Sequence, residues 1–234
     1  MKKVVISLGG SVLVPTLDSH LLGEWAATLR ELAQHYSVFC VCGGGGEARR
    51  YISVCRGLGL DDGTADELGI MVTRINAFLL LSALGDAAYP TVPATYREAK
   101  EAALHQRVVV MGGVAPGQTT DAVSAVLAEE VSADLLVNAT AIDAIYSADP
   151  KKDPAAERYS RITPANLIDI IMKERMGAGS NMIVDLLAAK IVERSNIPFI
   201  VMDGKNPALV KDAIIAGRFD GTVVSDQQRN VLPL

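Results

Sequence analysis

The chain has 234 residues and a formal net charge of −5, and half of its residues are hydrophobic. This length allows one large domain or two small ones, with a core large enough to be stable without disulfides or structural metal ions. The lack of a basic patch argues against a nucleic-acid partner. Three cysteines, partly within an apolar run, predict reduced core thiols rather than a disulfide framework or a zinc site.

Membrane and export signals are also missing from the sequence. No apolar run approaches the roughly 20 residues that a membrane-spanning helix needs. The chain begins with Met1-Lys2-Lys3 and leads straight into an apolar run rather than a signal peptide. We therefore expect a cytoplasmic protein without a membrane partner.

The first two predicted strands both end in glycines. An apolar run at 4–8 is followed by Gly9, Gly10 and Ser11, and after a predicted helix at 18–34 a second run at 38–42 stops at four glycines. A helix-compatible segment then begins with Arg49 and Arg50 in its first turn. Backbone amides of a glycine turn at a helix N-terminus can bind an anion because no side chain holds the anion away. The pattern predicts an anion site.

A long helix and a third glycine turn follow. The helix is expected over 64–84, then a short strand at 88–92, a short helix at 96–104 and a strand at 107–111. That strand runs into a loop rich in glycine and proline, and a further helix is expected over 122–131. Thr119, Thr120 and Asp121 can each cap this helix, but a cap needs one residue. The excess predicts that the loop faces a ligand.

A fourth strand, at 133–138, leads into a loop of functional interest. Residues 139–154 hold three acids, two lysines and a tyrosine, and so long a loop is unusual in a compact domain without a function. Two Asp-Pro turns do not account for Asp143, which lies just past the buried strand. The remaining predicted elements are helices at 164–174, 183–193 and 208–215 and strands at 197–202 and 221–224.

Alternation of strands and helices predicts an α/β fold, a three-layer αβα sandwich with a mostly parallel central sheet. We expect one domain over 1–225 and a frayed tail over 226–234. The glycine turns and Asp143 would gather at the carboxyl ends of the strands, where such sheets bind ligands. Gly43, Gly45 and Ala48 also fit a dinucleotide-binding fingerprint, but that fingerprint normally follows the first strand. No P-loop is present, because no Gly-Lys-Ser/Thr follows any turn.

Four of these segments resemble the amino-acid kinase superfamily, in the same order over about residues 4–224. They are Gly9-Gly10-Ser11, the 43–46 turn with Ala48-Arg49, residues 112–121 and residues 140–151. Within that superfamily, Asp-Leu-Leu-Ala-Ala-Lys at 185–190 and the closing Gly221-Thr222 are similar to the archaeal type of uridylate (UMP) kinase. The resemblance implies transfer of the ATP γ-phosphoryl group to UMP in pyrimidine nucleotide biosynthesis, with Mg²⁺ and usually in a homohexamer.

The resemblance also implies roles for individual residues. An ATP site would be formed by Gly9, Gly10, Gly45, Arg49, Thr140, Tyr146 and Asp149. A UMP site would be formed by Gly44, Asp66, Val114, Ala115, Pro116, Gly117, Gln118, Thr119 and Thr120. Arg49 and Asp143 would be catalytic, Arg49 as a fork for phosphate oxygens and Asp143 by orienting cationic groups or metal-bound phosphates. No side chain is assigned as a metal ligand.

Two positions depart from the family pattern. Many relatives carry lysine where this chain has Ser7, and archaeal uridylate kinases often carry lysine where it has Gly46; both changes remove positive charge near the transferred group. Two alternatives therefore stay open. One is a related kinase acting on a carboxylate or on isopentenyl phosphate, although no histidine lies in a glycine turn. The other is a non-catalytic oxyanion store like the molybdate- and tungstate-storage relatives.

Overall fold

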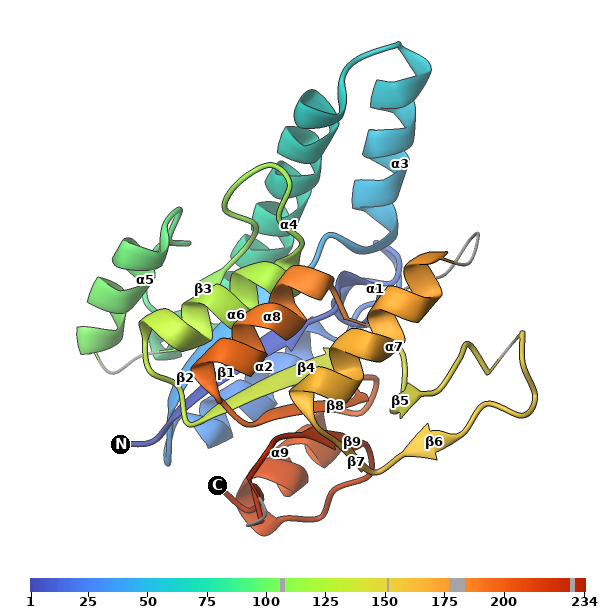
Figure 1. Cartoon of the computed structure of the whole chain (residues 1–234). Coiled ribbons are helices and arrows are strands. Elements are labelled where there is room, and N and C mark those ends of the chain that lie inside the picture. The colour runs from blue at the N-terminus through green and yellow to red at the C-terminus, as the bar shows by residue number, and fades with distance from the viewer. Residues whose placement is uncertain (106–107, 151, 177–183, 228–229) are drawn as a thin grey trace.

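A seven-stranded sheet forms the centre of the computed structural model, which describes residues 1–105, 108–150, 152–176, 184–227 and 230–234 (Figure 1). The strand order is β3-β2-β1-β4-β8-β9-β7. The five strands from β3 to β8 are parallel, whereas β9 runs antiparallel to β8 and pairs in parallel with β7. The strands are β1 (Lys3–Leu8), β2 (Ser37–Cys42), β3 (Val109–Met111), β4 (Leu135–Thr140), β7 (Arg161–Ile162), β8 (Phe199–Asp203) and β9 (Thr222–Val224).

Helices cover both faces of this sheet, as Figure 1 shows. They are α1 (Gly10–Leu13), α2 (Leu22–Leu32), α3 (Gly45–Gly57), α4 (Asp62–Leu84), α5 (Tyr96–Ala102), α6 (Thr120–Glu130), α7 (Pro164–Met176), α8 (Leu186–Ser195) and α9 (Pro207–Ala216), with short 3₁₀ turns at Gly85–Ala87 and Ala103–His105.

Alternate residues of each strand supply the two halves of the core. Val4 and Ile6 belong to a buried cluster with α2, the second half of α4 and α9. Val5 and Phe39 belong to a second cluster with α5, α6, α7 and α8. Central parallel strands are buried on both faces and therefore read as continuous apolar runs. The predicted three-layer sandwich with a mostly parallel sheet is confirmed.

Helices α3 and α4 pack against each other and project beyond the sheet (Figure 1). Large apolar side chains are exposed along the pair: Tyr51, Val54, Leu58, Met71, Ile75, Phe78 and Leu79. The sequence was expected to hold no run long and apolar enough to cross a membrane, but Asp62–Ala87, which is α4 with the 3₁₀ turn after it, is one such helix in the described chain by length and composition. The second half of α4 is a core helix, since Ala77, Leu80 and Leu84 are buried.

Several expected boundaries were wrong for identifiable reasons. Residues 88–92 do not form a strand; only Ala88 bridges Val108, because Pro90 and Pro93 cannot donate to a ladder. The long loop after β4 contains β5 (Ile145–Tyr146), paired antiparallel with β6 (Arg158–Tyr159). Helix α8 begins at Leu186 rather than at 183, a residue that lies outside the described part.

The end of the chain packs against the domain, where the sequence indicated fraying. Val231 is buried, and the Leu234 N–H donates to the carbonyl of Ile214 at 2.9 Å. The Tyr36 hydroxyl also donates to the Leu234 carbonyl at 3.2 Å. The division into a domain at 1–225 and a tail at 226–234 stays a prediction.

Candidate active site

The first two glycine turns touch each other at the carboxyl ends of β1 and β2. The Gly43 N–H donates to Leu8 O at 2.9 Å, which joins the end of β2 to that of β1. A Cβ on Gly10 would lie 2.2 Å from the Gly45 nitrogen, and one on Gly43 would lie 2.5 Å from the Gly10 nitrogen. These glycines are therefore required for close backbone contact, and the same contact brings two sets of amides to one place.

The residues expected to hold ATP gather partly around this contact. Gly9 donates its N–H to Ala139 O at 2.9 Å, and a Cβ on it would contact Thr140. Arg49 reaches the first turn, because its Nη2 donates to Ser11 Oγ at 3.4 Å. Gly9, Gly10, Gly45, Arg49 and Thr140 thus come together. Tyr146 and Asp149 lie in the segment around the β5–β6 hairpin, where Asp149 faces Lys152 Nζ at 4.0 Å.

Polar residues in the middle of α4 position the second and third glycine turns. Asn76, which is buried, donates from Nδ2 to Gly43 O at 2.8 Å. Thr73 Oγ1 accepts from the Gly113 N–H at 2.7 Å, and Arg74 Nε donates to Gly113 O at 3.1 Å. These roles could not be predicted from local sequence patterns, because the contacts join residues 33 to 40 positions apart.

A cavity of about 230 Å³ lies between α3, α4 and the loop before α6. Asp66 Oδ2 accepts from the Gly117 N–H at 2.7 Å, and the Tyr96 hydroxyl donates to Gln118 Oε1 at 2.9 Å. The lining residues are Gly44, Ala48, Ile52, Asp66, Gly69, Ile70, Thr73, Gly113, Gln118, Thr119 and Thr120. Five of the nine residues expected to hold UMP line this cavity, and Gly117 is bonded to one of them. Val114, Ala115 and Pro116 lie in the same loop but outside the lining.

Two carboxylates that the sequence did not assign to the site lie beside this cavity. Asp121 accepts from Ser7 Oγ at 2.8 Å, and Asp185 Oδ2 accepts from Thr119 Oγ1 at 2.6 Å. Burial of its carboxyl raises the pKa of Asp121 to about 6 despite the Ser7 hydrogen bond, and the nearby charge of Asp185 adds to the rise. Thr119 is the residue that caps α6. Asn138, in register with Ser7, is buried, and its Nδ2 has no partner among the described residues.

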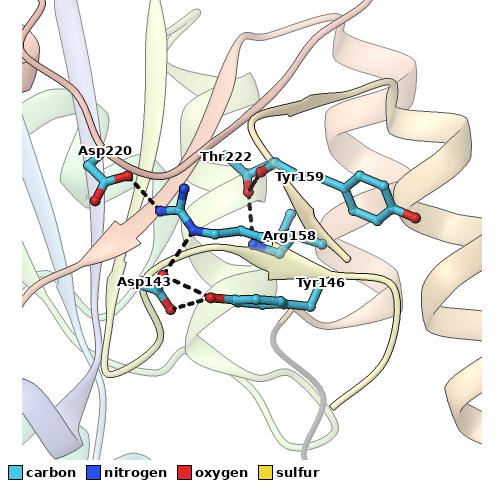
Figure 2. Close-up of polar contacts among 7 residues, drawn as sticks. Asp143, Tyr146, Arg158, Tyr159, Asp220 and Thr222 are labelled. Atoms are coloured by element: carbon cyan, nitrogen blue, oxygen red, sulfur yellow. Dashed lines mark hydrogen bonds and ion pairs between the residues drawn. The ribbon is translucent and has the colours of Figure 1, made fainter. Parts of the chain in front are cut away.

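Asp143 lies in a polar cluster on the β5–β6 hairpin (Figure 2). The Tyr146 hydroxyl donates to Asp143 Oδ2 at 3.0 Å, and Arg158 Nε donates to the same oxygen at 3.0 Å. Arg158 Nη2 also donates to Asp220 Oδ1 at 2.6 Å. Partial burial raises the pKa of Asp143, but the hydrogen bonds from Tyr146 and Arg158 lower it below its usual value. The carboxylate thus orients Tyr146 and Arg158, and its expected catalytic role stays a prediction.

Thr222 fixes the base of the hairpin to β9. Its Oγ1 accepts from the Ile145 N–H at 2.8 Å and donates to the Tyr159 carbonyl, as Figure 2 shows. A further cation lies near the end of β4, because Lys205 Nζ donates to Ala141 O at 3.2 Å. Lys205 was missed, although it directly follows a strand and a glycine as the recognised turns do.

Comparison with known proteins identifies the family. The model of the amino acid kinase family matches residues 2–203. The chain belongs to the amino acid kinase family. Within this family, it is 60% identical over 227 residues to a uridylate kinase of Methanocorpusculum labreanum, with 97% of each chain covered. It is 55% identical over 233 residues to a uridylate kinase of Methanoculleus marisnigri, with both chains covered completely.

A solved structure shows the same architecture. The crystal structure of uridylate kinase from Archaeoglobus fulgidus is 46% identical in sequence and has a TM-score of 0.86. The match covers 95% of this chain and 100% of that chain. This member of the amino acid kinase family therefore shares its fold with a protein solved as a uridylate kinase over almost its whole length.

Proposed function

We propose that this chain transfers the γ-phosphoryl group of ATP to UMP and releases ADP and UDP for pyrimidine nucleotide biosynthesis. The observation that carries the proposal is the cavity lined by Gly44, Asp66, Gln118, Thr119 and Thr120, which opens beside the contact between the two glycine turns. Relatives 55% and 60% identical that are named uridylate kinase support the same acceptor.

Positioning of two anions is the main catalytic task in this reaction. Phosphoryl transfer depends on holding attacking and leaving oxygens in line while charge on the transferred group is neutralised. In the proposal, amides of Gly9, Gly10 and Gly45 hold the ATP phosphates, and the Arg49 guanidinium binds phosphate oxygens beside them. Gly44 and the N-terminus of α6 would hold the UMP phosphate, which is already an anion and needs no strong general base.

Asp121 and Asp185 fit a Mg²⁺ ion that arrives with ATP. Mg²⁺ is usually bound by one or two carboxylates together with substrate phosphates and waters. Burial and the neighbouring charge of Asp185 raise the pKa of Asp121, and a cation bound between the two carboxylates would favour the ionised form. The described residues contain no cluster of three His, Cys, Asp or Glu side chains that would hold a metal alone. When bound, the ion would neutralise charge on the transferred group.

Other cations would compensate for the lysines missing at Ser7 and Gly46. Ser7 carries no charge, and its buried hydroxyl donates to Asp121. Arg49 lies against the first glycine turn, and Lys205 lies at the end of β8 beside Ala141. We assign the compensating charge to these two residues.

The acceptor pocket disfavours the two alternative functions. Asp66 places a carboxylate in the lining, where it would repel a bound oxyanion and would accept hydrogen bonds from ribose hydroxyl groups. An oxyanion store, or a kinase for a carboxylate or for isopentenyl phosphate, has no ribose to use this group. We therefore favour a nucleotide acceptor.

We also propose a homo-oligomer, a hexamer by resemblance, that assembles through the exposed apolar side chains of α3 and α4. Contiguous exposed apolar surface on a soluble protein commonly marks an interface. Phe78, 60% exposed, is the largest side chain of this set on α4, and Leu58 is 72% exposed. Light scattering should give a single oligomer, and Phe78→Glu should reduce its size; a monomer at micromolar concentration would overturn this proposal. A cytoplasmic location without nucleic-acid or membrane partners stays a prediction from composition.

The test of the proposed function is ADP release from Mg–ATP with separate acceptors: UMP, CMP, AMP, GMP, acetylglutamate and isopentenyl phosphate. We expect turnover with UMP, and its loss in Asp66→Asn and Arg49→Ala. Arg97→Ala, which changes an exposed arginine paired with Glu101 on α5, is the matched control. Turnover with a different acceptor alone, or with none of the six, would overturn the assignment.

A further inference from the structure

A hydrogen bond from Tyr96 orients the side-chain amide of Gln118 in this structure. The Tyr96 hydroxyl at the start of α5 donates to Gln118 Oε1 at 2.9 Å. Tyr96 is partly buried and packs against the core cluster that contains α6. Burial raises the pKa of Tyr96 to about 12, so the phenol keeps its proton and remains a donor across the physiological range.

This contact decides which end of the amide is available to a ligand. A glutamine amide has an acceptor oxygen at one end and an NH₂ donor group at the other. Because Oε1 faces Tyr96 and Gln118 lines the cavity, the group left for a ligand is Nε2. Gln118 therefore offers hydrogen-bond donors to whatever occupies this end of the cavity.

The neighbouring Asp66 indicates which part of a nucleotide lies there. Its carboxylate is bonded to the amide of Gly117, the residue that precedes Gln118. The negative charge of Asp66 disfavours a phosphate beside it, whereas the backbone amides of the glycine turn at Gly44 favour one. The nucleoside would then lie beside Asp66 and Gln118.

We propose that the Tyr96–Gln118 pair selects uracil over cytosine, an inference that rests on the proposed function. At C4 uracil carries a carbonyl acceptor, whereas cytosine carries an amino donor. Nε2 of Gln118 pairs with the carbonyl, but opposite the amino group it leaves two donors facing each other. A single unpaired polar group in a binding site lowers affinity about ten- to a hundredfold, and this is the discrimination that the pair supplies.

Removing the Tyr96 hydroxyl tests this role without removing Gln118. In Tyr96→Phe the amide is free to turn and to present Oε1 to the cytosine amino group. We expect kcat/KM for CMP to rise and kcat/KM for UMP to fall, so that the UMP/CMP ratio drops about tenfold or more. Gln118→Ala should lose the same selectivity, and adding Tyr96→Phe to it should change the ratio no further.

The matched control is Tyr89→Phe, which removes a hydroxyl from another partly buried tyrosine packed on the same core cluster and should keep the wild-type ratio. An unchanged ratio in Tyr96→Phe, or an equal fall for both substrates, would overturn the proposal. Calorimetric measurement of UMP and CMP binding tests the role of the Tyr96–Gln118 pair independently of whether the chain phosphorylates UMP. If the wild type bound both nucleotides but phosphorylated neither, a lower UMP/CMP affinity ratio in Tyr96→Phe would support the inference and an equal ratio would overturn it.

Discussion

The raised pKa of Asp121 predicts that this carboxyl destabilises the folded protein as the pH rises. Its carboxyl has a folded-state pKa of about 6 because protein atoms exclude water from it and Asp185 lies nearby. In the unfolded chain the same group has its ordinary pKa of 3.8. Between these two values the folded state binds more protons than the unfolded state, so the contribution of this group to stability falls as pH rises from about 4 to 6.

The size of the effect follows from the difference between the two pKa values. Each pKa unit corresponds to about 1.4 kcal/mol, which gives at most about 3 kcal/mol for ionisation of Asp121 in the folded protein. Asp121 retains some accessible surface, and screening by solvent brings the expected value to about 1–3 kcal/mol. This cost is fully present above about pH 7.

Asp121→Asn isolates the contribution of this carboxyl. The asparagine is neutral at every pH, and its Oδ1 can still accept from Ser7. We expect the smallest difference in stability between the two proteins at pH 4 and an advantage of about 1–3 kcal/mol for the variant at pH 8. Urea unfolding at one fixed protein concentration measures the difference, and Asp18→Asn controls for the change in net charge.

The variant should also lose phosphoryl transfer, because it lacks the charge proposed to face the metal. Greater stability at pH 8 with lower activity is the expected combination for a functional carboxylate whose burial destabilises the fold. A stability difference that stays constant from pH 4 to 8, or that grows toward acid pH, would refute the reasoning about this carboxyl.

Three further substitutions test the construction of the site. Gly10→Ala should destabilise the protein by about 1–3 kcal/mol or more in thermal unfolding, because its Cβ would lie 2.2 Å from a backbone nitrogen of the second turn; wild-type stability would contradict the close contact. Asn76→Ala should lower kcat at least about tenfold by leaving Gly43 O without its donor, and unchanged steady-state kinetics would exclude this positioning role. Arg158→Ala should raise the KM for ATP but not that for UMP, because it releases the carboxylate that orients Tyr146; equal changes in both constants would point to a general loss of structure.

The fold could be predicted from the sequence because its central strands are short apolar runs and all of them except β4 are followed directly by glycine. A strand that is buried on both faces is an unbroken run of apolar residues, and helices of ordinary length separate these runs. The hairpin of β5 and β6 was missed because a strand of two residues is too short to show alternation. Its pairing partner also lies beyond a loop with two prolines.

The site could be predicted only in part, because many of its contacts join residues that are far apart in the sequence. The glycine turns are local patterns, and each was visible by itself. The bond between Ser7 and Asp121 joins residues 114 positions apart, so Asp121 could be interpreted only as a possible helix cap. Four consecutive glycines suggested anion binding, but the structure adds a second reason for them, the contact between Gly43, Gly45 and the first turn.

Helix α4 connects the acceptor pocket to the proposed oligomer interface. Asp66, Thr73 and Asn76 lie on the side that faces the glycine turns, whereas Ile75 and Phe78 are exposed to solvent. A helix that is apolar on nearly every side is normally covered on every side, which favours burial of the exposed stripe by a second copy. In that assembly the residues that shape the acceptor pocket and those that bind the partner belong to one rigid helix. Displacement of α4 at the interface would then move Asp66 and Asn76 together, and subunit association would affect acceptor binding directly.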